Sequence, residues 1–247
     1  MSSTSAPSVT LTILPETAIG ALVTARPGLA RVFEALGIDY CCGGKQTLAV
    51  ACASRGLELC STIARIEAAA AAEAARPPDV NVAAMSLTAL ADHIEATHHT
   101  YLKAELPRLV EMADRVATKH EWRDGRLPEV AAAVRTVAEE MLSHMEKEEV
   151  VLFPMVREIE AGVRRGLRGG DLTGPIEQME AEHEAAGQIT AKLRELTDGF
   201  TPDAQACNTH RALLAGLVEF EADLHRHVHK ENSILFPRAL ALGAGRS

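Results

Sequence analysis

Apolar residues recur at every third or fourth position through four long stretches between residues 86 and 242. This spacing places apolar side chains on one face of an α-helix and leaves the opposite face polar. The pattern predicts helices over residues 86–119, 128–161, 174–197 and 203–242. Because helices of this length suit a four-helix bundle with up-down topology, the predicted fold class is all-α.

Polar residues interrupt three of these apolar faces near the middle of the helix. They are His144 and Glu148 in the second helix, His183 in the third, and His227 and Glu231 in the fourth. A buried carboxylate is costly without a positive partner, and no Lys or Arg stands on the same faces. A bound metal ion would supply the missing positive charge.

Two of these polar segments are closely similar in sequence. The run HMEKEEVVLFP begins at His144, and HVHKENSILFP begins at His227. In each run a His and a Glu four residues later lie on one side of a helix, roughly 6 Å apart along its axis, which is a chelating arrangement. The repeat therefore indicates that the bundle consists of two diverged halves, each with one lone His and one His-x-x-x-Glu pair.

The first helix offers two candidate ligands, His98 and His99, which are adjacent in the chain. Neighbouring helical residues point about 100° apart, so one of the two should serve. The periodicity with Ile94 and Leu102 slightly favours His98, whereas His99 shares a side with Glu95. The spacing leaves the choice open.

The ligand types indicate which metal fits. Four imidazoles and two carboxylates exceed the four ligands of a structural zinc site, and calcium prefers oxygen ligands throughout. Six nitrogen and oxygen ligands from four helices favour two irons bridged by the glutamate pair. An oxide or hydroxide bridge would leave one open position on each iron for a small diatomic molecule. A ferritin-like oxidase is a weaker alternative, because it does not explain the repeated sequences that begin at His144 and His227.

Two other glutamates are candidates for hydrogen bonds to the ligand imidazoles. Glu140 lies four residues before His144, on the same predicted helical face, and Glu182 directly precedes His183. Such outer partners orient metal-bound imidazoles. An ordinary surface position explains either residue equally well.

The chain before the bundle has shorter helical patterns, over residues 17–25, 27–36, 46–55 and 59–75. The segment Arg76-Pro77-Pro78-Asp79 then stops helix propagation, because proline lacks the N–H and clashes with the preceding turn. We expect a disordered start over residues 1–10, a small helical domain over 11–76, a linker over 77–85 and the bundle over 86–242. The Gly- and Arg-rich segment 162–170 is expected to be a flexible crossover loop.

The small domain contains adjacent cysteines, Cys41 and Cys42, followed by two glycines. A following helix N-terminus and Lys45 would favour thiolate character, which makes the two cysteines a candidate reactive or metal-handling pair. The alternative is a turn in which the two thiols are incidental.

Composition narrows the classes of function. The net charge of −9 argues against a general nucleic-acid-binding surface. The start lacks the features of a secretion signal, and no apolar run is long enough to cross a membrane, so a cytoplasmic location is expected. The odd count of 5 cysteines favours free thiols over a disulfide framework.

These motifs, taken together and in order, resemble the iron–sulfur cluster repair proteins of the RIC, or YtfE/ScdA, type. The segments that carry the resemblance are IDYCCGGKQTL, ADHIEATHH, SHMEKEEVVLFPM, GPIEQMEAEHEAAG and HVHKENSILFPRAL. The resemblance implies an ScdA-type N-terminal domain and a hemerythrin-like bundle with a non-haem di-iron centre. Its implied ligands are His99, His144, Glu148, His183, His227 and Glu231, and the His98 position often holds an aromatic residue in the family.

The same resemblance implies a function in stress response. Such proteins restore iron–sulfur clusters damaged by nitric oxide or oxidants, by releasing iron from a labile di-iron centre, and Cys41 and Cys42 would help in docking or transfer. The implied partners are damaged iron–sulfur proteins and the diatomics NO and O2, and a homodimer is left open. The alternatives are a nitric oxide reductase and a hemerythrin-like sensor of O2 or NO.

Overall fold

The computed structural model describes residues 13–74, 80–163 and 172–244, and every regular element in these ranges is helical. The predicted all-α class is therefore confirmed. The chain divides into two compact units, Met1–Ala83 and Ala84–Ser247. The expected disorder of residues 1–10 and most of the expected crossover loop fall outside the described residues. Among the described helices, none combines the length and hydropathy needed to cross a membrane.

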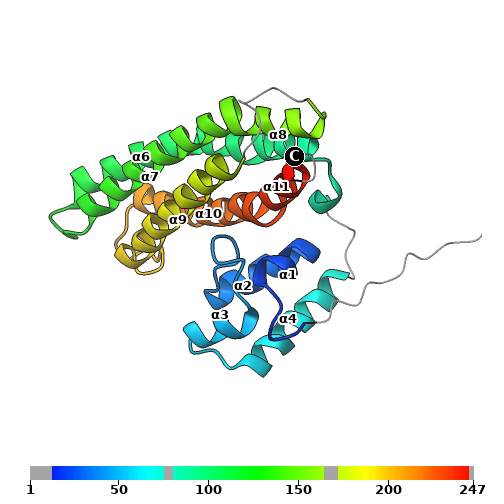
Figure 1. The fold of residues 1–247 in the computed structure, drawn as a ribbon. Coiled ribbons are helices and arrows are strands. Elements are labelled where there is room, and N and C mark those ends of the chain that lie inside the picture. Colours follow the sequence, from blue (N-terminus) through cyan, green and yellow to red (C-terminus); the bar gives the residue numbers. More distant parts are fainter. Residues whose placement is uncertain (1–12, 75–79, 164–171, 245–247) are drawn as a thin grey trace, which may run out of the picture. The chain divides into compact units, whose positions relative to one another are not determined.

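The N-terminal unit is built from four helices: α1 (Ile19–Ala25), α2 (Ala30–Leu36), α3 (Leu48–Ser54) and α4 (Leu59–Ala74), with a 3-10 turn, η1 (Pro27–Leu29), before α2 (Figure 1). Fully buried Leu22, Leu29, Phe33, Leu48 and Ile66 form its core.

Local chemistry sets the ends of two helices in this unit. α2 ends at Gly37, whose φ of 65° lies in the left-handed region that glycine adopts without a steric penalty. α3 begins at Leu48, after the start expected at residue 46, because Thr47 is its N-cap. The Thr47 side chain accepts a hydrogen bond from the backbone N–H of Val50 at 3.3 Å.

The second unit contains four rods, each a single helix or a line of consecutive helical elements (Figure 1). The first rod comprises α5 (Leu87–Ile94), η3 (Glu95–His99) and α6 (Thr100–His120). The second comprises α7 (Leu127–Lys147), η4 (Glu148–Leu152) and α8 (Phe153–Glu160). The third is α9 (Thr173–Leu196), and the fourth comprises α10 (Asn208–Lys230), η5 (Glu231–Leu235) and α11 (Phe236–Ala244). A short 3-10 turn, η2 (Val82–Ala84), precedes the first rod.

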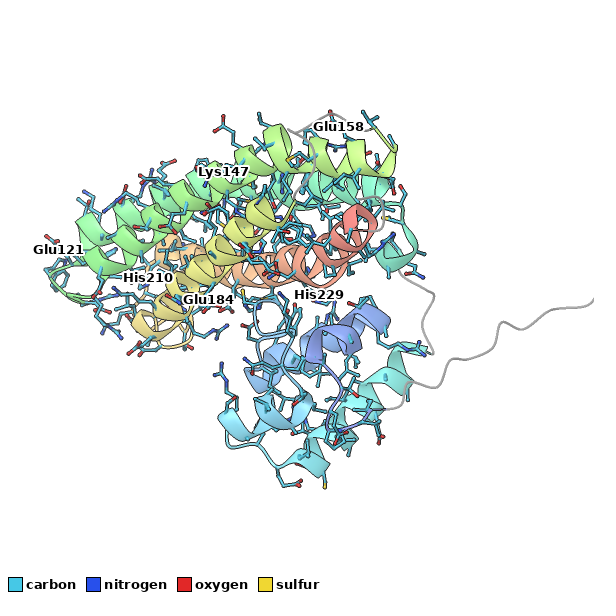
Figure 2. All side chains as sticks on the ribbon, in the orientation of Figure 1. Glu121, Lys147, Glu158, Glu184, His210 and His229 are labelled. Carbon is cyan, nitrogen blue, oxygen red and sulfur yellow. The ribbon has the colours of Figure 1, made fainter. Side chains whose placement is uncertain are left out.

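The rods pack as a bundle: α6 lies against α7 and α10, and α7 lies against α9. Side chains from the rods fill the space between their ribbons (Figure 2). The apolar faces predicted from the sequence form this interior, in which Leu90, Ile94, Phe153, Phe220 and Phe236 are fully buried. Pro107 lies inside α6 without ending it.

Three of the four rods are interrupted by a π-helical turn, and the three turns are η3, η4 and η5. His99 is the last residue of η3, Glu148 is the first of η4, and Glu231 is the first of η5. A π-turn inserts one residue into the helix and changes which side chains face inward, and such turns are frequent at functional sites. Each of these turns therefore coincides with a predicted metal ligand.

The N-terminus of α5 is capped by a residue from another rod. The Glu160 carboxylate, at the end of α8, accepts hydrogen bonds from the backbone N–H groups of Leu87 (2.7 Å) and Thr88 (2.8 Å). Ser86 accepts a third, from Ala89, at 3.1 Å. The first N–H groups of a helix have no partner within the helix, so Glu160 satisfies two of them and ties the first rod to the second.

We predict that Glu160→Ala lowers the free energy of unfolding by about 1 kcal/mol at neutral pH, because two helix-terminal N–H groups lose their acceptor. Burial by itself would raise the pKa of Glu160. Its hydrogen bonds with Thr88 and Leu87 outweigh this effect and hold the pKa below the ordinary value of a glutamate. The stability that Glu160 contributes is therefore fully present at pH values above its pKa in the unfolded chain. It is lost as the pH falls through the lower pKa that Glu160 has in the folded protein. Denaturant titrations at pH 7 and pH 3 measure this difference. Glu139→Ala, at an exposed position of α7, is the control and should change little.

Candidate metal centre

Six buried side chains converge inside the bundle as two overlapping groups. The first metal group is His99, Glu148, His227 and Glu231, and the second metal group is His144, Glu148, His183 and Glu231. Within each group, one ligand atom from every residue lies within 4.8 Å of all the others. The structure thus brings together the six residues that the sequence singled out, with contributions from all four rods.

Both glutamates face both groups. The Glu148 Oε2 atom lies 3.3 Å from His99 Nε2 and 3.4 Å from His144 Nε2. The two oxygens of Glu231 divide their contacts, with Oε1 3.0 Å from His227 Nε2 and Oε2 3.1 Å from His183 Nε2. Each carboxylate therefore has the placement of a bridge between two metal positions.

Three of the four imidazoles are held by an oxygen atom at Nδ1. His99 bonds to Glu149 Oε1 at 2.8 Å, His144 to Glu182 Oε2 at 2.9 Å, and His183 to Asn232 Oδ1 at 2.9 Å. Because these oxygens accept hydrogen bonds, the ring proton sits on Nδ1 and the lone pair of Nε2 points into the centre. This is the tautomer that binds a metal through Nε2.

Neither ligand glutamate is paired with a Lys or Arg in the described part of the structure; Glu148 and Glu231 both contact only imidazoles at ion-pair distance. The Nε2 atoms of His144 and His183 are 3.0 Å apart, and those of His99 and His227 are 3.2 Å apart. Glu148 is 0% exposed, and neither of its oxygens has a hydrogen-bond donor in the described structure. Facing lone pairs and a buried carboxylate without donors are both unfavourable unless a cation lies among them. The donor set of imidazole nitrogen and carboxylate oxygen fits a pair of transition-metal ions.

The pKa values of the ligands are set by burial and by the ligands' contacts with one another. Burial lowers the pKa of His99, but its contacts with Glu148 outweigh this and raise the pKa above the ordinary value. Burial raises the pKa of Glu231, but His227 and His183 outweigh this and lower it well below the ordinary value. Burial, reinforced by His183, lowers the pKa of His144 to about 3, and burial lowers that of His227 to about 4 despite Glu231 beside it. Both rings are thus neutral and available to a metal. Burial and the neighbouring Glu231 raise the pKa of Glu148, so the protein alone does not stabilise its charge.

Two phenylalanines cover the imidazoles from the apolar side. The Phe153 ring stacks on His99 with centroids 5.7 Å apart, and the Phe236 ring stacks on His183 at 6.0 Å. Both are the Phe of the repeated Leu-Phe-Pro sequence. The repeat therefore preserves a packing surface for the lone His of each half as well as the chelating pairs.

The structure separates the two candidates in the first rod. His99 joins the first metal group, whereas His98 forms hydrogen bonds with Asp223 at 2.9 Å and Lys230 at 2.6 Å. The slight preference of the helical periodicity for His98 is wrong, because the π-turn η3 changes the register just before the ligand.

Of the two glutamates proposed as outer partners, Glu182 contacts a ligand imidazole, that of His144 and not of the adjacent His183. Glu140 is exposed, and Glu182 occupies Nδ1 of His144, the ring that Glu140 was expected to hold. The sequence analysis missed Glu149 and Asn232, which hold His99 and His183. Each directly follows a ligand glutamate in the repeated phrase, and this shared position is the signal that would have identified them.

Cys41 and Cys42 lie in the N-terminal unit, grouped with Asp39. The Asp39 carboxylate accepts hydrogen bonds from the backbone N–H groups of Cys41 (2.9 Å), Cys42 (3.0 Å) and Gly43 (2.9 Å). The hydrogen bond with Cys42 and burial raise the pKa of the Cys41 thiol. The expected thiolate character of Cys41 is therefore wrong, because α3 begins only at Leu48 and a carboxylate lies 3.1 Å from the Cys41 sulfur.

Comparison with known proteins identifies both units. Residues 90–239 match the hemerythrin HHE cation binding domain, and residues 15–70 match a domain of unknown function, DUF542. A protein of Musicola paradisiaca named iron-sulfur cluster repair protein YtfE is 41% identical over 225 residues, which is 91% of this chain and 96% of that protein. Proteins of the same name from Yersinia pseudotuberculosis and Yersinia pestis are each 40% identical over 223 residues, covering 90% of this chain and 96% of the relative.

We predict that Glu148→Leu raises the free energy of unfolding of the metal-free protein by about 1–4 kcal/mol, because it removes a buried carboxylate that lacks donors. The same substitution should sharply reduce metal loading. Denaturation of metal-free protein and metal quantitation after reconstitution measure the two effects. Glu146→Leu, at an exposed position on α7, is the control and should change neither. Full metal occupancy in Glu148→Leu would contradict the assignment.

Proposed function

Because the chain belongs to the family of iron–sulfur cluster repair proteins that carry a hemerythrin HHE cation-binding domain, we propose that it repairs iron–sulfur clusters damaged by nitrosative or oxidative stress. In this proposal the bundle stores iron and gives it up to a damaged cluster. The observation that carries the proposal is the convergence of four buried imidazoles and two buried carboxylates on two overlapping groups of potential metal ligands.

The six buried side chains would hold two non-haem iron ions. His99 and His227 would ligate one, His144 and His183 the other, and Glu148 and Glu231 would bridge them. An oxo or hydroxo group would complete the bridge. When bound, such a pair would supply exchangeable iron able to bind a small diatomic molecule.

The ligand types favour release. The six donors are imidazole nitrogens and carboxylate oxygens, which are harder ligands than thiolates. A damaged cluster site that offers cysteine thiolates is a softer and more negative acceptor for iron.

We propose that the N-terminal unit takes part in delivery through Cys41 and Cys42. Their sulfur atoms and an Asp39 oxygen lie within 4.8 Å of one another, so they form a compact group able to hold a metal ion. Asp39 fixes the backbone of the cysteine turn, which keeps this geometry in place. The role of this unit would be to receive or pass on iron during contact with a damaged iron–sulfur protein, in the cytoplasm.

We predict that iron-loaded protein reactivates a cluster enzyme previously inactivated by nitric oxide, and that metal-free protein does not. Glu231→Leu should fail in the same assay, because it removes a ligand shared by both metal groups. Enzyme activity and transfer of isotopically labelled iron are measured together. Equal reactivation by metal-free protein would contradict iron donation. Sustained nitrous oxide formation with a reductant, without cluster repair, would instead support the alternative of a nitric oxide reductase.

We also predict that replacing Cys41 and Cys42 together with Ala leaves the absorption spectrum of the iron centre unchanged but slows repair several-fold, because the thiols lie in the other unit. Cys60→Ala is the matched control, since Cys60 is an exposed thiol of the same unit. Unchanged repair by the double variant would remove these thiols from the mechanism.

A further inference from the structure

The four imidazoles of the metal centre do not have equal support. Oxygen acceptors hold Nδ1 of His99, His144 and His183, as described above. The Nδ1 atom of His227 has no hydrogen-bond partner among the described residues, although the residue is 0% exposed. His227 belongs to the first metal group, so the two metal positions are not equivalent.

The internal repeat shows where the missing partner would be. In the second half of the bundle, Glu182 directly precedes the lone His183. Its carboxylate accepts a hydrogen bond from Nδ1 of His144, which is the His of the chelating pair in the first half. The matching residue in the first half is His98, which directly precedes His99 and contacts the matching imidazole, His227. The contact is a parallel stack, with ring centroids 5.2 Å apart and planes 7° apart. The stack orients the ring but offers Nδ1 no acceptor.

This difference changes what each position does without metal. In the second metal group the protons of both imidazoles are fixed on Nδ1, so their Nε2 lone pairs face each other at 3.0 Å. In the first metal group the proton of His227 is not held at Nδ1. On Nε2 it can be donated to Glu231 Oε1 at 3.0 Å or to His99 Nε2 at 3.2 Å. The two imidazoles of the first position can therefore pair with each other or with Glu231 when no metal is bound, whereas the facing Nε2 atoms of the second position cannot pair with each other.

The first metal group also lies next to a surface pocket. A pocket of about 430 Å³ is lined by His99, its partner Glu149, and the carboxylates of Asp92 and Glu95. Lys103 binds Glu149 at 2.6 Å and also lines the pocket, and Arg157 pairs with Asp92 and Glu95. A cation leaving by His99 would meet carboxylates whose present partners are flexible, partly exposed side chains.

From these observations we propose that the metal ion held by His99 and His227 is the exchangeable one, and that the ion held by His144 and His183 is retained. The inference rests on the proposed function, since it identifies which iron would be donated. His98 is then a positioning residue that acts through His227, at the place where the other half has a hydrogen-bonded partner of the ligand. The loss of such hydrogen-bonded partners typically changes metal affinity 10–100-fold.

The direct test locates the exchanged ion. Iron-loaded protein is treated with a ferrous chelator until one equivalent has left, the empty position is refilled with zinc, and zinc is located by anomalous diffraction at its absorption edge. Zinc between His99 and His227 is the expected result. Zinc between His144 and His183, zinc spread equally over both positions, or loss of both irons in a single phase would each overturn the inference.

Variants test the role of the stack by the kinetics of chelation. His98→Ala should release the first equivalent about 10-fold faster, whereas His98→Phe, which keeps a flat ring on His227, should resemble the wild type. Asn232→Leu is the matched change in the second metal group, because it removes the Nδ1 partner of His183, and it should accelerate only the second equivalent. Circular dichroism confirms that each variant folds, and the zinc location in the wild type needs no variant.

The outcomes separate this inference from the proposed function. If zinc occupies the first metal group but labelled iron never reaches a damaged cluster, iron donation is wrong and the inequivalence of the positions stands. If repair proceeds while zinc is found in the second metal group, the inference is wrong and the proposed function stands.

Discussion

The interior of the bundle is organised around buried polar atoms that lack partners. The Nε2 lone pairs of His144 and His183 meet at 3.0 Å, and the Glu148 carboxylate is buried without a donor among the described residues. An apolar core would be more stable at these positions, and cations bound among the donors would offset this cost. The outer hydrogen bonds, the stacked phenylalanines and the π-turns all fix the donors in this otherwise unfavourable arrangement.

The π-turns explain how two consecutive residues can serve one centre. Glu148 reaches the metal positions while Glu149, the next residue, reaches the far side of His99. Glu231 and Asn232 repeat the arrangement with His183. In a regular α-helix adjacent side chains diverge by about 100°, which makes such shared orientation difficult. Each of these two π-turns thus places two consecutive side chains at the centre. The first is a ligand, and the second forms a hydrogen bond with a ligand imidazole from another rod.

Much of this could be predicted from the sequence, and the failures have separate causes. The periodic apolar faces predicted the rods, and the duplicated sequences predicted His144, Glu148, His227 and Glu231, because chelating pairs and packing repeat at fixed spacing. Helical periodicity slightly favoured His98 and overlooked Glu149 and Asn232, because it assumes a regular α-helix and three π-turns change the register beside the ligands. Glu140 lies in the regular helix α7 with His144, but Glu182 from another rod occupies that imidazole. The thiol chemistry of Cys41 was misjudged because its burial and its contact with Asp39 depend on tertiary structure.

The way the ligands are shared carries a consequence for the two halves of the bundle. Each metal position takes one imidazole from the first two rods and one from the last two, so neither half of the bundle owns a complete site. A pseudo-two-fold axis between the positions would exchange His99 with His183 and His144 with His227. A polypeptide corresponding to one half of the bundle could bind metal in this way only as a symmetric pair of subunits, in which every substitution would appear twice. In a single chain the matching positions can differ, as Glu149 and Asn232 do.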